Sequence, residues 1–152
     1  MSRRKQIRLT SAEQAAYLQT SRKIALATLD KDGFPHVVAM GFLAKDGAIY
    51  MASYVSAQKV LNIRRNPKVG LLVEDGQNYG EFRGVMIRGY CDIIEDPEQV
   101  EATMQAMVAK HARSADDRPP RGAMSSAPKR VLLKVTPAKV SSWDHAKLQG
   151  KY

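Results

Sequence analysis

Short apolar runs separated by turn residues fill the first third of the chain and predict a series of β-strands. The runs cover residues 23–29, 36–44 and 48–54, and the turns Asp-Lys-Asp-Gly (30–33) and Lys-Asp-Gly (45–47) lie between them. An Asp-Gly pair between two apolar runs is a strong signal for a β-hairpin. The connections are too short to hold the helices that join parallel strands, so these strands are expected to be antiparallel.

Three further apolar runs continue this pattern toward the C-terminus. They cover residues 69–73, 84–94 and 131–135, and residues 137–142 are expected to extend the sheet beyond the last of them. Gly89 interrupts the second run and predicts a bulge or bend, of the kind that a small barrel needs at its corners. The whole pattern predicts a mainly β protein with peripheral helices, in which six antiparallel strands form a small barrel.

Three segments have helical patterns. The first covers residues 11–21, with Ser11 as its expected N-cap, and the second follows Ser56, which is expected to cap it, and stops at Asn66-Pro67. The third begins at Pro97 and carries apolar side chains at helical spacing. Its stripe predicts a packed core face rather than a cofactor site, and consists of Val100, Met104, Met107 and Val108.

The 152 residues are enough for one domain with a real core. Outside the predicted elements lie a basic N-terminal tail, a loop rich in Arg, Pro, Ser and Ala, and a polar C-terminal tail: residues 1–10, 112–128 and 141–152. The single cysteine, Cys91, excludes an intrachain disulfide framework, and its apolar neighbours predict that it is buried. No run approaches the ~20 apolar residues that span a bilayer. We therefore expect a cytoplasmic protein that does not bind membranes.

The formal net charge of +9 is concentrated in three stretches: the N-terminal tail, residues 59–68 and residues 118–134. Such charge can attract nucleic acid, but the sequence has no helix-turn-helix, zinc-finger or RNP-like motif. A solvated basic surface is the simplest interpretation, an anionic small molecule comes next, and nucleic acid is the least favoured partner. The three histidines, His36, His111 and His145, are too scattered to predict a metal site.

The start of the helix after Ser56 is the strongest candidate for a functional site. Free N–H groups in a first turn and the helix dipole favour an anion, and Lys59 adds a positive charge there. Arg64 and Arg65 cannot easily face one ligand, because adjacent helix residues point about 100° apart, and Arg64 is the expected second contact. The alternative is a solvated basic helix face. No acid–base pair or nucleophilic triad is recognisable, so an enzyme with this sequence would need a cofactor.

The residues around this helix are similar to a known family. Ser56-Ala57-Gln58-Lys59, the segment 62–67 (Asn-Ile-Arg-Arg-Asn-Pro) and the segment 71–76 resemble the pyridoxamine 5′-phosphate oxidase-like superfamily. The resemblance begins at residue 12, includes residues 32–36 and extends to residue 150. Two later blocks, residues 79–85 and 142–148, resemble the flavin and deazaflavin oxidoreductases that include reductases dependent on coenzyme F420.

This resemblance implies a homodimeric split β-barrel with a cofactor in each of two grooves between the subunits. It implies an oxidoreductase that transfers a hydride between coenzyme F420 or FMN and an electron-poor conjugated small molecule, with no catalytic side chain. The alternative is a binding or carrier protein for a flavin or haem without turnover. The basic surface suits the anionic tail of F420 slightly better than FMN, and the few basic residues near Tyr152 make pyridoxal phosphate synthesis an unfavoured activity.

The resemblance also assigns cofactor-binding positions residue by residue. The phosphate would lie against Ser56, Gln58 and Lys59, and Met40, Gly41 and Phe42 match the strand beside the ring. Gly41 is equally explained by a bulge, Trp143 by dimer packing and His145 by a surface role. The complete predicted set is Met40, Gly41, Phe42, Ser53, Ser56, Gln58, Lys59, Asn62, Arg64, Tyr79, Trp143 and His145.

Overall fold

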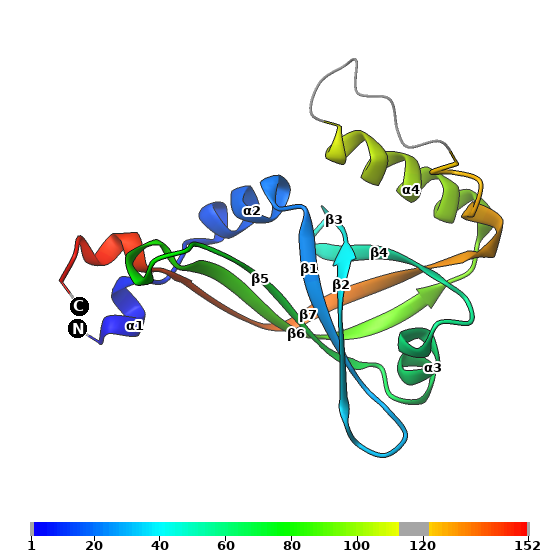
Figure 1. The fold of residues 1–152 in the computed structure, drawn as a ribbon, viewed down its shortest axis with the longest axis horizontal. Helices are drawn as coiled ribbons and strands as arrows, with labels where there is room; N and C mark the ends of the chain where they lie inside the picture. The colour runs from blue at the N-terminus through cyan, green and yellow to red at the C-terminus, as the bar shows by residue number, and fades with distance from the viewer. Residues whose placement is uncertain (1, 113–121, 152) are drawn as a thin grey trace.

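One curled antiparallel sheet organises the fold (Figure 1), which is described by a computed structural model for residues 2–112 and 122–151. The strands lie in the order β2-β1-β5-β6-β7-β4-β3. Their bounds are β1 Lys23–Leu29, β2 Pro35–Gly41, β3 Leu43–Lys45, β4 Ala48–Tyr54, β5 Lys68–Asp75, β6 Arg83–Ile94 and β7 Arg130–Asp144. The mainly β, antiparallel architecture confirms the predicted fold class.

The predicted number of six strands is wrong, because the run 36–44 forms two strands. β2 pairs with β1, with Gly41 opposite Lys23, whereas β3 pairs with β4, with Leu43 opposite Tyr50. The chain therefore changes partner at Phe42, whose side chain is fully buried. A continuous apolar run carries no mark of such a change, because both strands and the residue between them contribute to the core.

The two predicted Asp-Gly turns are confirmed. In the first, Asp30 Oδ1 accepts hydrogen bonds of 2.9 Å from the backbone N–H groups of Asp32 and Phe34. In the second, Asp46 and Gly47 have φ values of 51° and 75°. Two successive residues with positive φ match the right-handed twist of the flanking strands, which explains the short hairpin between β3 and β4.

A bulge interrupts the pairing of β6 with β7, the last strand. The register of β6 with β7 shifts between Arg88 and Gly89, as the sequence predicted, and β7 includes both predicted segments 131–135 and 137–142. A Cβ atom at Gly89 would lie 2.6 Å from the carbonyl oxygen of Thr136. Only glycine therefore lets the two backbones approach this closely.

Four α-helices and three short 3₁₀ helices surround the sheet. They are α1 Arg3–Gln6, α2 Ser11–Thr20, α3 Gln58–Arg65, α4 Pro97–His111, η1 Tyr79–Glu81, η2 Ala127–Lys129 and η3 His145–Leu148, counted over the described residues. The structure thus places α1 within the expected N-terminal tail. In the expected C-terminal tail it places the end of β7 and η3.

Both predicted N-caps are wrong. Thr10, not Ser11, caps α2: its hydroxyl accepts from the N–H of Glu13, whose carboxylate accepts from the N–H of Thr10. The N-cap of α3 is Ala57, so no side chain caps this helix, and Ser56 lies one residue too early, in the turn that follows β4. Sequence patterns rarely place helix ends to within one residue.

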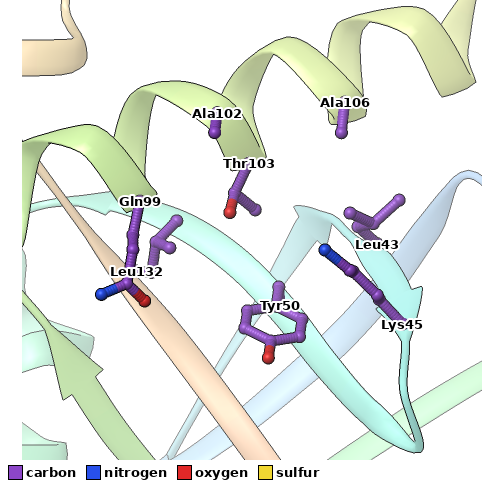
Figure 2. Close-up of a pocket in the computed structure, with 8 residues that line it drawn as sticks. All are labelled: Leu43, Lys45, Tyr50, Gln99, Ala102, Thr103, Ala106 and Leu132. Carbon is purple, nitrogen blue, oxygen red and sulfur yellow. The ribbon is translucent and has the colours of Figure 1, made fainter.

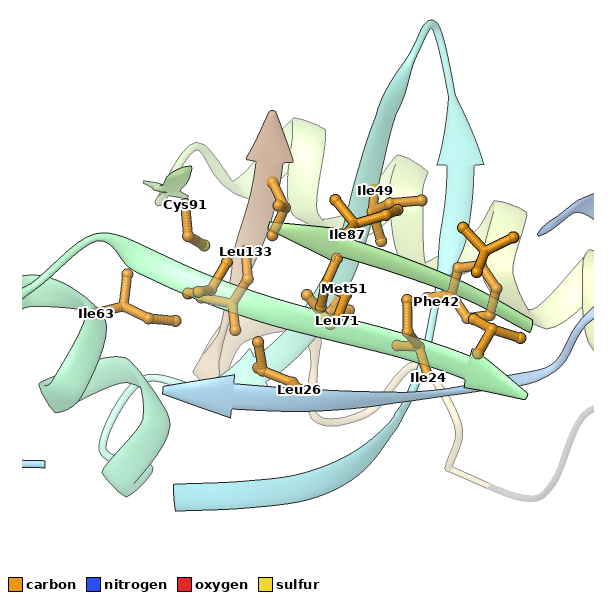
Figure 3. Packing of buried hydrophobic residues seen from close by; sticks show 14 of the residues in the cluster. Ile24, Leu26, Phe42, Ile49, Met51, Ile63, Leu71, Ile87, Cys91 and Leu133 are labelled. Carbon is orange, nitrogen blue, oxygen red and sulfur yellow. The ribbon is translucent and has the colours of Figure 1, made fainter. Parts of the chain in front are cut away.

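The core occupies the concave side of the curled sheet. It is built from inward-facing strand residues such as Ile24, Leu26, Met51 and Leu71, together with Phe42 (Figure 3). Cys91 belongs to this cluster, as predicted, and burial raises the pKa of its thiol to about 12. A second, smaller cluster under α4 contains Val100, Met104 and Leu132 of β7. Two of the four residues of the predicted apolar stripe are therefore core, whereas Met107 and Val108 are only partly buried.

No helix in the described part of the chain is both long enough and apolar enough to span a bilayer.

Candidate cofactor-binding site

Lys59 is the least neutralised cation of the predicted phosphate site. It lies in the first turn of α3 and is partly buried. Within residues 2–112 and 122–151 no carboxylate pairs with it. Burial lowers the pKa of its ammonium group, and the positive charge of Arg130 lowers it further. Two cations close together without an acid favour a bound anion.

Arg130 is a residue that the sequence analysis missed. It is the first residue of β7 and lies opposite Tyr54, the last residue of β4. Its guanidinium carbon lies 3.7 Å from the centroid of the Tyr54 ring, and its Nε donates to Ser126 Oγ at 3.2 Å. The basic stretch 118–134 was a signal of positive charge, but no local pattern indicates that one of its residues lies beside the segment that leads into α3.

A network of amides and one guanidinium attaches α3 to β1. Asn62 is fully buried and donates to Thr28 Oγ1 at 3.0 Å. Its Oδ1 accepts from Gln58 Nε2 at 2.8 Å and from Arg65 at 3.3 Å, and Arg65 also donates to the carbonyl of Leu29 at 2.7 Å. Gln58 and Asn62, both predicted to bind the cofactor, therefore have contacts that position the helix.

The remaining predicted residues near α3 differ in accessibility. Arg64 forms an exposed ion pair of 2.7 Å with Glu95. Ser53 is buried, and its hydroxyl donates to the carbonyl of Tyr54 at 3.2 Å, whereas Ser56 is exposed. Ser56 and Lys59 are thus the predicted phosphate contacts that an anion can reach without breaking a hydrogen bond between described side chains.

The predicted ring-contacting segment, Met40 to Phe42, lies under the C-terminal end of α4. A Cβ atom at Gly41 would lie 3.1 Å from His111 Cε1. Lys110 Nζ lies 3.8 Å from the centroid of the buried Phe42 ring and donates to the carbonyl oxygens of Phe42 and Leu18. Burial lowers the pKa of Lys110, and burial followed by the charges of Lys110 and Arg22 lowers the pKa of His111.

The other three predicted residues come together at the far end of the sheet. His145 Nδ1 lies 2.8 Å from the carbonyl oxygen of Tyr79, and the two rings meet edge to face with centroids 4.6 Å apart. The ring of Trp143 lies against Gly84, where any Cβ atom would collide with it. Figure 1 shows η3 and the end of β7 at the opposite end of the molecule from α3. The predicted set therefore falls into three places within one chain.

A separate cleft lies between α4 and the strands β3 and β4 (Figure 2). Its volume is about 210 Å³, and Thr103, Lys45 and Tyr50 give it a polar side. Its lining residues are Leu43, Lys45, Tyr50, Gln99, Ala102, Thr103, Ala106 and Leu132. None of the predicted cofactor-binding residues lines it. Across the described ranges, no group of three or more His, Cys, Asp and Glu side chains is arranged to hold a metal ion.

Solved structures similar to this chain include flavin-related proteins. A conserved hypothetical protein from Mycobacterium tuberculosis, Rv2991, is 33% identical, with a TM-score of 0.87 over 98% of this chain and 93% of that chain. An F420 reductase is 28% identical, with a TM-score of 0.67 over 83% of this chain and 94% of that one. The heme storage protein HutZ from Vibrio cholerae is 15% identical, with a TM-score of 0.68 over 87% and 94%, and shows the fold alone.

None of the curated proteins matches the chain. A comparison with protein families, by contrast, agrees with the solved structures. The family model described as pyridoxamine 5′-phosphate oxidase matches residues 10–144, which include β1 to β7 and most of the predicted site residues. The resemblance found in the sequence is therefore confirmed, and the chain belongs to the pyridoxamine 5′-phosphate oxidase family, with the split-barrel fold of that superfamily.

Proposed function

We propose that this protein is an oxidoreductase that binds coenzyme F420 or FMN and transfers a hydride to an electron-poor conjugated small molecule. The observation that carries the proposal is a pair of cations with no carboxylate partner among the described residues: Lys59 in the first turn of α3, and Arg130 held beside the segment that leads into this helix. A cofactor phosphate is the anion that the family resemblance places there. The similarity to an F420 reductase over most of both chains supports the choice of cofactor class.

A second copy of the chain completes the proposed groove. Leu72 and Met86 are neighbours on β5 and β6, and each is 38% exposed on the outward face of the sheet. Ala25 and Ser141 extend this face as the register partners of Leu72 and Met86, so four strands present small or apolar side chains. We propose that two copies pack through this face. The family resemblance implies that Tyr79 and Trp143 reach the groove from the partner subunit or from the C-terminal tail, and such packing is the arrangement that we propose for them.

The chain's own residues bind and orient rather than react. When bound, the reduced cofactor would supply a hydride to a carbon of the conjugated substrate. A proton from solvent would then neutralise the resulting substrate anion. Lys59 holds the phosphate end, and the aromatic side chains of the other subunit limit the position of the ring and exclude water from its face. Among the described residues of the site, no carboxylic acid is placed to act as a general acid or base.

Titration of the purified protein with oxidised FMN and with coenzyme F420 tests this proposal. The fluorescence of each cofactor reports binding, and we expect saturation with at least one of them. F420 is expected to bind more tightly than FMN, because the net charge of +9 suits its additional carboxylates. If neither cofactor binds saturably, the proposed function is wrong.

A carrier without turnover is the second candidate, because the same contacts can hold a cofactor without any reaction. The absence of an acid–base pair among the described site residues is compatible with it. Reoxidation of the bound, reduced cofactor by a panel of quinones and nitroaromatic compounds separates the two candidates. A rate that rises with substrate concentration supports the oxidoreductase, and a rate equal to that of free cofactor in buffer supports the carrier.

A further inference from the structure

We infer that Arg130, rather than Arg64, is the second cation that holds the cofactor phosphate beside Lys59. This inference rests on the proposed function, because the anion is the phosphate of the proposed cofactor. It assigns a specificity-determining role to a residue outside the helix that carries the family's sequence pattern.

The backbone holds Arg130 next to the loop that leads into α3. Tyr54 and Arg130 are register partners at the ends of β4 and β7. One residue further, the N–H of Val55 donates to the carbonyl of Lys129 at 3.1 Å. The start of β7 is therefore joined to the segment that ends β4 and precedes Ala57, the N-cap of α3.

The side chain of Arg130 is fixed in place but keeps donors for a ligand. Its plane stacks on Tyr54 at 3.7 Å, and only its Nε has a hydrogen-bond partner among the described residues, Ser126. The two terminal nitrogens are left to bind an anion. A guanidinium held in this way presents two parallel N–H donors that match the oxygens of a phosphate, at a reduced cost in side-chain entropy.

The two arginines of α3 are already engaged. Arg64 pairs with Glu95 at 2.7 Å, and Arg65 donates to the carbonyl of Leu29 and to Asn62. The charge of Arg64 is therefore offset by a carboxylate, and Nη2 of Arg65 is used by contacts that position the helix. Lys59 and Arg130 have no ion pair with a carboxylate in the described part of the chain. They therefore belong to the part of the positive surface around α3 that no described carboxylate offsets.

Two charge-neutralising variants with a phosphate-free control test the inference. Arg130→Gln and Arg64→Gln each remove one positive charge near α3, and binding is measured with FMN and with riboflavin, which lacks the phosphate. Loss of a charge-assisted hydrogen bond predicts roughly 10- to 100-fold weaker FMN binding for Arg130→Gln. Arg64→Gln is expected to change FMN affinity less than threefold, and neither variant should change riboflavin affinity. The same comparison can be made between F420 and the phosphate-free deazaflavin alcohol that contains its ring.

The outcomes separate the inference from the proposed function. Equal losses of FMN affinity in the two variants would mean that only the net positive charge near α3 matters, and would overturn the inference. A loss of riboflavin affinity that matches the loss of FMN affinity would overturn it too. Arg130→Lys keeps the charge and should restore part of the affinity for FMN.

If the wild-type protein binds no flavin or deazaflavin, the proposed function is wrong. Titration with inorganic phosphate then tests the anion site by itself. Shifts of the amide resonances of residues 57–59 on phosphate addition, reduced in Arg130→Gln, support the site. No shifts in the wild-type protein overturn it.

Discussion

The hydrogen bonds around α3 divide its polar side chains by role. Gln58, Asn62 and Arg65 bond to one another or to β1, so they position the helix. Lys59 has no such contact in the described part of the chain, and we propose it as the residue that meets the ligand. A sequence motif contains both kinds of residue, because a binding helix needs residues that hold it in place as much as residues that contact the ligand. Only the coordinates separate them.

The lowered pKa of Lys59 predicts that phosphate binding weakens at alkaline pH. The ammonium form is present below its pKa, which burial and the charge of Arg130 hold below the ordinary value of 10.5. As pH rises through this lowered pKa, the charge is lost and FMN affinity should fall. Binding measured from pH 7 to 10 is expected to show this fall in the wild-type protein, whereas Lys59→Gln should bind weakly throughout.

Riboflavin is the control for this pH dependence, because it has no phosphate to meet Lys59. Its affinity should fall only where the flavin ring itself ionises, and equally in both proteins. A fall of FMN affinity that persists unchanged in Lys59→Gln would assign the titration to another group.

Asn62 is expected to be important for stability rather than only for binding. Asn62→Ala removes the acceptor of Gln58 and Arg65 and leaves the Thr28 hydroxyl, which is 2% exposed, without this partner. An unsatisfied buried polar group costs about 1–3 kcal/mol. Urea unfolding should show that Asn62→Ala lowers the free energy of unfolding by this amount. Gln58→Ala, at an exposed position of the same network, should lower it by less than half as much. Equal decreases in the two variants would contradict the structural role of Asn62.

At the scale of elements, the apolar runs and the turns between them predicted most of the strands and the two hairpins, but not the pairing of strands that are distant in sequence. The two Asp-Gly turns, the bulge at Gly89 and the helix after Pro97 follow from local chemistry, and the structure contains all of them. The break at Phe42 follows from a change of strand partner, from β1 to β4, which no residue of the continuous apolar run marks. The contact of Arg130 with Tyr54 was missed for another reason, because the two residues lie far apart in the sequence.

The capping residue of α2 gives a direct test of structure against sequence pattern. Thr10→Ala removes the capping box with Glu13 and should cost about 1 kcal/mol in the free energy of unfolding. Ser11→Ala changes a residue that the pattern favoured as the cap, yet Ser11 is the first residue of the helix, and the free energy of unfolding should change by only a few tenths of a kcal/mol or rise slightly, because alanine is the better helix former. Urea unfolding of the two variants, measured under the same conditions, decides between Thr10 and Ser11 as the cap. A larger loss for Ser11→Ala would contradict the observed cap.

At the scale of the whole molecule, one chain holds only part of the proposed site. Trp143 belongs to the end of β7 and His145 to η3, and these segments lie at the end of the sheet opposite α3 (Figure 1). Tyr79 of η1 contacts His145 there. The pairing of β6 with β7, in which Gly84 lies opposite Trp143, holds the end of β7 at this end of the sheet. A second copy is the simplest way to bring these residues and α3 to one ligand. Cofactor affinity and association should therefore depend on the same surface.

This dependence predicts that a charge on the outward face of the sheet separates the subunits and abolishes cofactor binding. Leu72→Lys places an ammonium beside Met86, where burial against a second copy would desolvate it at a cost of several kcal/mol. Light scattering should give twice the chain mass for the wild-type protein and one chain mass for Leu72→Lys. The variant should retain its far-UV circular dichroism but lose FMN and F420 binding. Leu72→Met, which keeps the position apolar, should remain dimeric and bind both; a monomeric variant with full affinity would show that one chain suffices.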